Sequence, residues 1–336
     1  MNRLAIVILN WDGANDTLAA VHSLSINPVT DKIVVIDNGS QQLDFAKLKP
    51  LYKLSTVVVL KNNRNLGFAG GVNTGIHWAI ERGYEFVGLL NNDAKVNDTW
   101  VKNMLLPFKS SSSVVAVTSL MLNYSGKKID STSEQYSNWG LPFPRSRGLK
   151  TKDAPESGYV FGATGGATLY KTSLFKEIGL FDETFFAYYE DVDICFRAQL
   201  AGHKVYYTNK AIAYHKQGAT SKKIPGFTVY QTFKNIPLLY IKNVPLPLLI
   251  PIGARLWLSY LLMFGNAIKK GTGLHALKGW LASIWYFWTS ALWKRFIIQR
   301  RKVVSNQYIS SMIYHDLPPD QTGMRKFRAF FVKKTP

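Results

Sequence analysis

The 336-residue sequence has a single cysteine, Cys195, so no disulfide bond can form within the chain. One cysteine also cannot make the cysteine and histidine cluster of a structural zinc site. The phosphate-binding signature G-x-x-x-x-G-K-[ST] is absent, and residues 67–71 only approximate a dinucleotide-binding motif. Low cysteine usage is typical of cytosolic proteins, and Cys195 itself is read as a small buried apolar residue.

Acidic residues are nearly absent from the last part of the chain. Residues 201–336 hold 21 Lys and Arg but only Asp316 and Asp320, a net charge of +19, whereas residues 1–200 carry a net charge of +1. The basic character of the protein therefore belongs to one region. Such a region favours a polyanionic partner, either nucleic acid or anionic lipid.

Short apolar runs alternate with helical patterns over the first 220 residues. Expected strands cover residues 5–9, 33–36, 56–60, 86–90, 114–118 and 167–170, and residues 71–81 show the apolar face of a helix. This alternation predicts an α/β fold with a mostly parallel sheet flanked by helices, in which ligands bind at the carboxyl ends of strands. Residues 123–158 lack long apolar runs and are predicted to form an irregular loop region, which is either functional or disordered.

The composition changes at about residue 221, which divides the chain into regions 1–220 and 221–336. Five of the nine tryptophans lie between positions 257 and 293, among lysines and arginines. Tryptophan beside basic residues is typical of the headgroup layer of a bilayer, whereas stacking on nucleic acid would not require so much leucine and isoleucine. We therefore expect a basic helical region that contacts an anionic membrane surface and no nucleic acid. Prolines and Arg255 make residues 246–265 a poor spanning helix, which favours in-plane or re-entrant helices.

Two aspartates directly follow expected strands. Asp37 lies in a tight turn, where a carboxylate can accept the imide N–H of uracil or thymine, but the turn alone also fits a simple Asx cap. Asp93 ends the tripeptide Asn91-Asn92-Asp93. Mg²⁺ and Mn²⁺ usually bind through one or two carboxylates and the substrate phosphates, so Asp93 is a candidate metal ligand, with a polar turn as the alternative.

A further acidic cluster opens an expected helix after the aromatic residues 185–189. Asp191 lies where the helix dipole favours negative charge, so it is either a helix cap or a carboxylate whose pKa its apolar neighbours raise towards that of a general base. Asp193 and Arg197 have the spacing of a surface ion pair. His215 closes another apolar run and is either a metal ligand or an ordinary polar residue.

Six ordered blocks, at residues 5–10, 33–40, 63–76, 89–94, 162–170 and 181–204, resemble glycosyltransferase family 2. The nearest branch looks like the bacterial rhamnosyltransferase-like enzymes of O-antigen and cell-wall polysaccharide synthesis. The resemblance covers roughly residues 3–220 and implies a GT-A fold with an inverting mechanism. It implies a catalytic base at Asp191 and a divalent metal, Mg²⁺ or Mn²⁺, at Asp93 and His215.

The same resemblance assigns the remaining site residues. The acceptor side would comprise Gly165, Gly166, Tyr189 and Glu190. The nucleotide side would comprise Asn10, Asp37, Asn38, Asn65, Gly67, Asn73 and Asn92. One departure is Asn91, which stands where the family often has the first aspartate of its D-x-D metal motif.

Sequence and resemblance together predict an inverting glycosyltransferase at the cytoplasmic face of the membrane. Its donor would be a dTDP- or UDP-linked sugar, with dTDP-rhamnose as the leading choice, and its acceptor a lipid-linked saccharide. Two alternatives remain: a catalytically inactive nucleotide-sugar-binding protein, suggested by Asn91, and a basic nucleic-acid-binding protein. A site that brings Asp37, Asp93, Asp191 and His215 together in one cleft would favour the glycosyltransferase over both alternatives.

Overall fold

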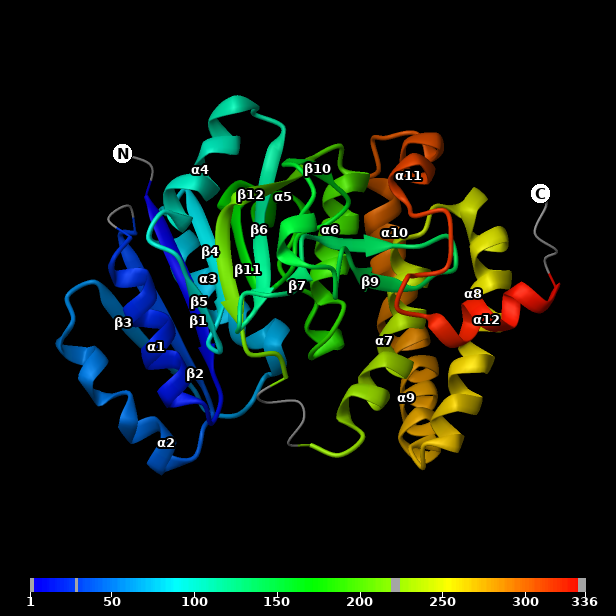
Figure 1. Cartoon of the computed structure of the whole chain (residues 1–336), viewed down its shortest axis with the longest axis horizontal. Coiled ribbons are helices and arrows are strands. Elements are labelled where there is room, and N and C mark those ends of the chain that lie inside the picture. The colour runs from blue at the N-terminus through cyan, green and yellow to red at the C-terminus, as the bar shows by residue number, and fades with distance from the viewer. Residues whose placement is uncertain (1–2, 28–29, 219–223, 332–336) are drawn as a thin grey trace. The chain divides into compact units, whose positions relative to one another are not determined.

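The computed structural model describes residues 3–27, 30–218 and 224–331. The chain divides into two compact units, shown with their elements in Figure 1. The first unit consists of residues 1–134 and 144–225, and the second of residues 135–143 and 226–336. The second unit thus includes a short segment that lies far from the rest of it in the sequence.

The first unit is built on one large sheet. Along the main path of the sheet the strands are β10 (Gly158–Val160), β12 (Lys204–His215), β6 (Val114–Asn123), β11 (Ala167–Lys171), β4 (Phe86–Asn91), β1 (Leu4–Asn10), β2 (Lys32–Asn38) and β3 (Val57–Asn62). In addition, β5 (Ala94–Val96) pairs with β12, and β7 (Ile129–Ser131) pairs with β6. The strands β3, β2, β1, β4, β6 and β12 run in one direction, and the other four run against their neighbours. The predicted mostly parallel α/β sheet is confirmed.

Helices cover both faces of this sheet because β1 and its neighbours are apolar on both sides. Along β1, Leu4, Ile6 and Ile8 belong to the core that includes α1 and α4, whereas Ala5 and Val7 belong to the core that includes α3, α5 and α6. The helices of this unit are α1 (Ala14–Ser25), α2 (Gln42–Lys47), α3 (Gly67–Glu81), α4 (Trp100–Ser110), α5 (Thr172–Ile178) and α6 (Glu190–Leu200), with 3-10 turns η1 (Lys49–Lys53), η2 (Thr151–Asp153) and η3 (Glu183–Phe185).

The region 123–158 is not the irregular loop that its composition predicts. It contains β7, η2 and a separate two-stranded sheet of β8 (Glu134–Tyr136) and β9 (Pro142–Pro144). Four of its serines and threonines are buried, Ser131, Thr132, Ser133 and Ser137, and the hydroxyl of Ser131 donates to the main-chain oxygen of Ser133 at 3.0 Å. Strands of three residues are too short to leave an apolar run in the sequence, which is why the prediction failed.

The second unit is helical apart from the segment 135–143, which holds most of β8 and β9. Its elements are α7 (Phe227–Asn243), α8 (Leu246–Lys269), α9 (Gly273–Tyr286), the π-helical turn η5 (Phe287–Ala291), α10 (Leu292–Arg300), α11 (Asn306–Met312) and α12 (Thr322–Phe331). Helices α7 and α9 approach closely because Gly279 has no side chain: a Cβ there would lie 2.3 Å from the main-chain oxygen of Tyr230. Phe233, Tyr260, Ala267 and Ala276 form a small apolar core contributed by α7, α8 and α9.

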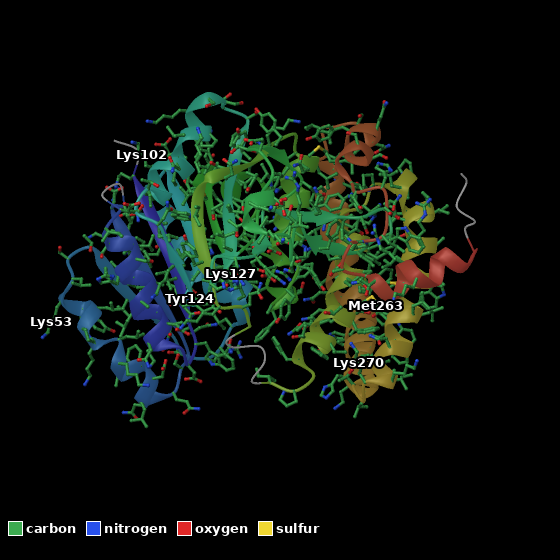
Figure 2. All side chains as sticks on the ribbon, in the orientation of Figure 1. Lys53, Lys102, Tyr124, Lys127, Met263 and Lys270 are labelled. Carbon is green, nitrogen blue, oxygen red and sulfur yellow. The ribbon has the colours of Figure 1, made fainter. Side chains whose placement is uncertain are left out.

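Large apolar side chains are exposed over α8, α9, η5 and α10. Among the described residues, α8 is one helix long and apolar enough to cross a membrane by length and composition, and only 22% of its most apolar stretch is buried. It runs without a break through Pro251 and Arg255, the residues that made it a poor spanning helix in sequence. Figure 2 marks Met263 in this helix and Lys270 just after it. We call the exposed set the apolar face: Leu246, Ile250, Trp257, Leu258, Leu261, Ile268, Leu274, Leu277, Leu281, Ile284, Trp285, Trp288, Leu292, Trp293 and Phe296.

Candidate active site

The polar residues predicted to close strands lie along one edge of the sheet. Asn10 pairs with Asp37 across β1 and β2, Asn91 is the last residue of β4, and His215 is the last residue of β12. These strands run in the same direction, so their carboxyl ends meet at the same edge. The expectation that polar side chains would follow the strands and gather there is met by the backbone topology.

Asp93 and His215 face each other at this edge. Oδ1 of Asp93 lies 3.0 Å from Nε2 of the His215 ring, and both side chains are largely buried. The amide nitrogen of Asn91 lies 3.3 Å from the same ring nitrogen. The two residues predicted as metal ligands are therefore adjacent, although more than 100 positions separate them in the sequence.

A third residue, Asp130 of β7, fixes the histidine ring from the other side. Its Oδ2 lies 2.6 Å from Nδ1 of His215, and its side chain is only 2% exposed. Arg147 forms an ion pair with Oδ1 of Asp130 at 2.9 Å, and Gln217 donates a hydrogen bond to the same oxygen. Burial acts to raise the pKa of Asp130, but the hydrogen bond with His215 and the charge of Arg147 outweigh it and hold the pKa below its usual value.

These contacts fit a divalent cation at Asp93 and His215. When Nδ1–H donates to Asp130, Nε2 of the neutral ring carries a lone pair that faces a carboxylate oxygen, and two acceptors at 3.0 Å need a proton or a metal between them. Burial opposes protonation of His215, but the hydrogen bonds and charges of Asp130 and Asp93 prevail and raise its pKa to about 9. The position therefore attracts positive charge.

The protein supplies only part of a coordination sphere. In the described ranges, no three His, Cys, Asp or Glu side chains are grouped to hold an ion by themselves. One carboxylate and one imidazole, with the imidazole oriented by a second carboxylate, leave positions for substrate phosphates, as Mg²⁺ and Mn²⁺ sites commonly do.

Asp191 lies in the first turn of α6 and is tied to the glycine pair before β11. Its Oδ2 accepts a hydrogen bond of 2.9 Å from the main-chain N–H of Gly165, and its Oδ1 accepts one of 2.8 Å from Val192. Gly166 follows Gly165 in the chain, and its main-chain oxygen accepts a hydrogen bond of 2.9 Å from the main-chain N–H of Asn91. Two glycines and Asn91 thus connect Asp191 to the Asp93–His215 pair.

Glycine fits this connection because the backbone approaches its neighbours closely. A Cβ on Gly165 would lie 3.2 Å from the ring of Phe68, and one on Gly166 would lie 2.9 Å from Met121 and 3.1 Å from the amide of Asn91. Burial raises the pKa of Asp191, and the backbone hydrogen bonds from Gly165 and Val192 offset this only in part. The structure thus gives Asp191 the raised pKa expected of a general base.

The aromatic segment before α6 is held in a strained conformation. Phe186, Tyr188 and Tyr189 have φ values of 62°, 70° and 71°, a region that costs a non-glycine residue about 1–3 kcal/mol. Packing maintains it: the main-chain oxygen of Phe186 accepts a hydrogen bond from Ala69, and a Cβ on Gly67 would lie 2.3 Å from that oxygen. Tyr189 and Glu190, the predicted acceptor residues, are the last residue of this segment and the first of α6.

The predicted nucleotide side is centred on Asn10. Its amide donates to Asp37 at 3.2 Å and to Ser40 at 3.1 Å, and its oxygen accepts from Thr17 at 2.7 Å. The amide of Asn92 donates to the same threonine at 3.3 Å. Oδ2 of Asp37 is buried and accepts no hydrogen bond from the described residues.

Asn38, Asn65 and Gly67 form a turn with internal hydrogen bonds. The amide of Asn38 donates to Asn65 and to the main-chain oxygen of Gly67, both at 3.0 Å, and the side-chain oxygen of Asn65 accepts from the N–H of Gly67 at 2.8 Å. These side chains position the start of α3. A direct contact with nucleotide stays a prediction for all three.

The side chain of Asn73 makes its hydrogen bonds to the segment before α6. Its amide donates to the main-chain oxygen of Phe181 at 2.9 Å and to Glu183 at 3.0 Å, and its oxygen accepts from the N–H of Phe181 at 3.1 Å. Asn73 thus clamps the segment that leads to the aromatic residues. Its predicted nucleotide contact is untested, and these bonds would compete with it.

Asp193 and Arg197 do not form the predicted surface ion pair. The 2.9 Å contact between their side chains is buried, with exposures of 0% and 7%. Arg197 also donates to the main-chain oxygens of Ile178 at 2.8 Å and Leu180 at 2.8 Å. The i, i+4 spacing identified the two partners correctly. Their burial could not be predicted in this way, because it depends on the packing of α5 against the face of α6 that carries them.

Sequence reasoning missed the residues that support His215. Asp130 and Arg147 lie in the region taken for a loop, and Gln217 follows the last strand. The only local signal was the alternation of Ile129, Asp130 and Ser131, which is too short to indicate a strand.

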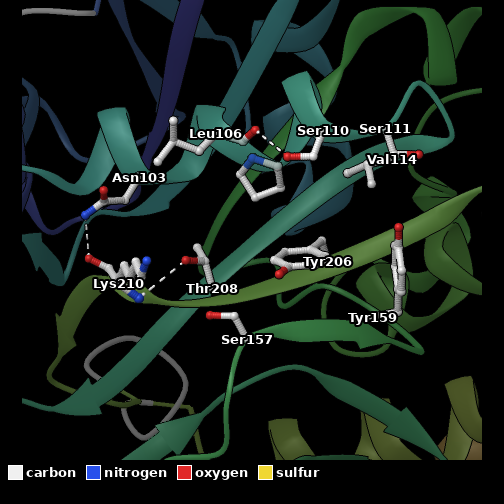
Figure 3. Close-up of a pocket in the computed structure, with 11 residues that line it drawn as sticks. Asn103, Leu106, Ser110, Ser111, Val114, Ser157, Tyr159, Tyr206, Thr208 and Lys210 are labelled. Carbon is white, nitrogen blue, oxygen red and sulfur yellow. Dashed lines mark hydrogen bonds between the residues drawn. The ribbon is translucent and has the colours of Figure 1, made fainter.

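A separate pocket of about 190 Å³ lies between α4 and β12, as Figure 3 shows. Asn103, Tyr159, Tyr206 and Lys210 are among its lining residues, and the amide of Asn103 donates to the main-chain oxygen of Lys210 at 2.6 Å. None of the predicted site residues lines this pocket. The candidate active site is therefore the sheet edge.

Residues 5–179 match the family model described as glycosyl transferase family 2. The chain belongs to this family, as its motifs predicted. It is 24% identical over 241 residues to the low-salt glycan biosynthesis hexosyltransferase Agl10 of Haloferax volcanii, covering 70% of this chain and 74% of the relative. It is also 24% identical over 234 residues to the dTDP-rhamnosyl transferase RfbF of Shigella flexneri, covering 66% of this chain and 74% of the relative.

Solved structures show the same fold. The structure of GalNAc-T7 with UDP, GalNAc and Mn²⁺ aligns with a TM-score of 0.57 at 19% identity, over 72% of this chain and 48% of that one, so this chain spans less than half of its length. A mannosyltransferase of Pyrobaculum calidifontis with GDP-mannose and Mn²⁺ aligns with a TM-score of 0.54 at 12% identity, over 92% of this chain and 86% of that one. At these identities the likeness establishes the fold alone.

Proposed function

We propose that this protein is an inverting glycosyltransferase that moves a sugar from a nucleotide diphosphate to a hydroxyl group of its acceptor. One observation carries the proposal beyond family membership. Asp191, a carboxylate with a raised pKa, is linked through Gly165, Gly166 and Asn91 to the Asp93–His215 pair at the same sheet edge. A base and a cation site on one edge are what single-step sugar transfer from a diphosphate requires.

Asp191 acts as the base in this proposal. Its carboxylate accepts the proton of the acceptor hydroxyl as the hydroxyl oxygen bonds to the anomeric carbon and the bond from that carbon to the diphosphate breaks. One step inverts the anomeric centre, so a second catalytic carboxylate is unnecessary. The amides of Gly165 and Val192 fix the direction of the carboxylate, and general-base catalysis of this kind contributes about 10²–10⁴-fold in rate.

Asp93 and His215 would hold a divalent metal, Mg²⁺ or Mn²⁺. When bound, the ion neutralises the negative charge of the departing diphosphate. Asp130 keeps Nε2 of His215 pointed at Asp93, and Arg147 holds Asp130 in place. Asn91 contributes an amide where many family members have a carboxylate, so charge at the site rests on Asp93.

The donor in this proposal carries uracil or thymine, and we propose dTDP-rhamnose first. The free buried oxygen of Asp37 suits the imide N–H that both bases present. The match to a dTDP-rhamnosyl transferase supports rhamnose, while the match to a hexosyltransferase keeps other sugars open to test.

The acceptor in this proposal is a lipid-linked saccharide at the cytoplasmic face of the membrane. The second unit supports it with the exposed apolar face, which carries Trp257, Trp285, Trp288 and Trp293. Basic residues dominate the sequence around this face, and the cytoplasmic leaflet is anionic. Tryptophan and basic residues together are typical of proteins that bind the bilayer interface.

A panel of nucleotide sugars tests the proposal directly. The purified protein is incubated with each donor, with Mg²⁺ or Mn²⁺, and with membrane extract as the acceptor source, and release of nucleoside diphosphate is measured. We expect release with one uracil or thymine donor, dependent on both the metal and the extract. Metal-dependent nucleotide binding without any release would instead indicate an inactive nucleotide-sugar-binding protein.

A further inference from the structure

Helices α7, α8 and α9 and the π-helical turn η5 enclose an apolar groove of about 270 Å³ in the second unit. Its walls include Trp257, Trp280 and Ile284, with Gly253 and Pro237 among the other lining residues. All of its lining residues belong to the second unit. The groove is therefore distinct from the sheet edge that carries the candidate active site.

The hydroxyl groups in the groove walls are already engaged in the protein. Tyr260 donates to the main-chain oxygen of Phe233 at 2.5 Å, and Tyr240 donates to that of Leu249 at 2.6 Å. Ser283 donates to the main-chain oxygen of Trp280 at 2.7 Å. A polar ligand would lose hydrogen bonds to water and recover few here, whereas a hydrocarbon chain would lose none.

Proline explains why the first of these bonds exists. Pro237 lies inside α7 and has no N–H, so the main-chain oxygen of Phe233, four residues earlier, has no partner within the helix. The hydroxyl of Tyr260 supplies that partner from α8. The polar groups that proline exposes are thus covered, and the groove surface stays apolar.

The groove is continuous with the apolar face. Trp257 and Ile284 line the groove and are also 56% and 42% exposed. The groove therefore opens where the second unit displays its tryptophans and leucines. Lys278, on α9 as Ile284 is, adds positive charge to this helix, and among residues 201–336 only Asp316 and Asp320 are acidic. An apolar groove in such a surface suits a hydrocarbon chain attached to an anionic headgroup.

We propose that this groove binds the hydrocarbon chain of the lipid-linked acceptor, whose phosphate groups supply the negative charge. The inference rests on the proposed function for the identity of the lipid. Adsorption to a membrane would bring the whole apolar face against a bilayer. The present proposal is more specific, because it places a single hydrocarbon chain in this groove. The groove selects the acceptor by its lipid part, independently of its sugar.

Photocrosslinking tests the assignment. The probe is a long-chain alkyl phosphate with a diazirine at the end of its chain, presented to the full-length protein in vesicles of neutral lipid. We expect labelling to map, by mass spectrometry, to groove residues of α8, α9 and η5. Labelling spread evenly over the apolar face would overturn the proposal, and this measurement needs no variant.

A matched pair of variants sharpens the test. Ile284→Lys places a charge in the groove, whereas Leu281→Lys places the same charge on the same helix at a residue that is 54% exposed and does not line the groove. We expect groove labelling to fall at least tenfold in the first variant and less than twofold in the second, with vesicle binding reduced equally in both. An equal loss of labelling in the two variants contradicts the proposal. Thermal unfolding of both variants verifies that they fold.

The outcome is separable from that of the proposed function. Chain labelling in the groove without diphosphate release from any nucleotide sugar would refute the transferase and leave the groove assignment standing. Transfer that proceeds at the same KM for short-chain and long-chain acceptors in detergent would refute the groove and leave the transferase standing.

Discussion

Oδ2 of Asp130 lies 2.6 Å from Nδ1 of His215, on the side of the ring opposite Asp93. The carboxylate comes from β7 and the histidine from the end of β12, so two distant segments of the sheet define the orientation of one imidazole. Carboxylate support of this kind fixes the tautomer of metal-binding histidines and strengthens them as ligands. It also makes a quantitative prediction about metal affinity.

Replacing Asp130 by Asn should weaken metal binding without removing a ligand. We expect Asp130→Asn to raise the Kd for Mn²⁺ by about 10–100-fold, because the ring loses its charged hydrogen-bond acceptor. Isothermal titration calorimetry in the presence of nucleoside diphosphate measures this. The control is Asp98→Asn, an exposed aspartate of the same unit, which should leave the Kd unchanged. Equal affinity in the Asp130 variant and the wild type would show that the ring needs no such support.

Asp191→Asn should abolish sugar transfer while nucleotide binding persists. The expected fall in kcat is about 10²–10⁴-fold, since the amide keeps the shape of the side chain but cannot accept the proton. Steady-state kinetics and nucleotide titration on the same preparation separate the two effects. Near-normal turnover in this variant rules out Asp191 as the base.

The pH dependence of transfer should follow the raised pKa of Asp191. Burial shifts this pKa upward, so the deprotonated form is lost at a higher pH than in an exposed aspartate, and kcat falls as the pH drops through the raised value. Kinetics across an acidic pH series measure the position of this limb. A limb at the ordinary aspartate pKa would contradict the assignment.

The raised pKa of Asp191 affects stability in the opposite direction: kcat rises with pH, whereas the stability of the fold falls. A raised pKa in the folded state means that the stabilising contribution of Asp191 is present below the unfolded-state pKa and is lost as pH rises through the folded-state pKa. Asp191→Asn removes this loss. The Tm of the variant should therefore fall less than the Tm of the wild type as the pH rises over that window. Thermal unfolding at a series of pH values measures both.

Breaking the buried pair of Asp193 and Arg197 should strongly destabilise the folded protein. Arg197→Met removes the cation that faces the buried Asp193 carboxylate, and we expect a loss of about 3–5 kcal/mol in the free energy of unfolding. Denaturant titration measures it. Arg82→Met, in the exposed pair with Glu81, is the matched control and should cost at most about 1 kcal/mol. Similar losses in the free energy of unfolding for the two variants would mean that breaking the buried pair costs no more than breaking a surface pair.

Base recognition by Asp37 can be tested with two nucleotides. Uracil presents an imide N–H and cytosine does not, so the wild type should bind UDP more tightly than CDP. Asp37→Ala should raise the Kd for UDP by about 10–100-fold, the loss of a hydrogen bond to a charged group, and change the Kd for CDP little. Competition titrations measure both values. An unchanged preference for UDP in the variant would place base recognition elsewhere.

Much of the catalytic unit could be predicted because its signals are local. Buried strands require apolar residues on both faces, so all six expected strands, including the antiparallel β11, appear as runs in the sequence and are present in the structure. Polar residues that end such runs must lie at the carboxyl edge of the sheet, which placed Asp37, Asn91 and His215 correctly. The segment 123–158 had no such signal, because β7, β8 and β9 are each only three residues long.

By itself, the sequence determined the alternation of strands and helices, the family, and the concentration of basic and aromatic residues after position 221. Only the tertiary structure decided that Asp130, 85 positions from His215, orients its ring, that Asp193 and Arg197 are buried, and that four helical elements enclose a groove. The physical reason is the range of the interactions. Periodicity and turn chemistry act between residues a few positions apart, whereas burial and side-chain pairing depend on which distant segments pack together.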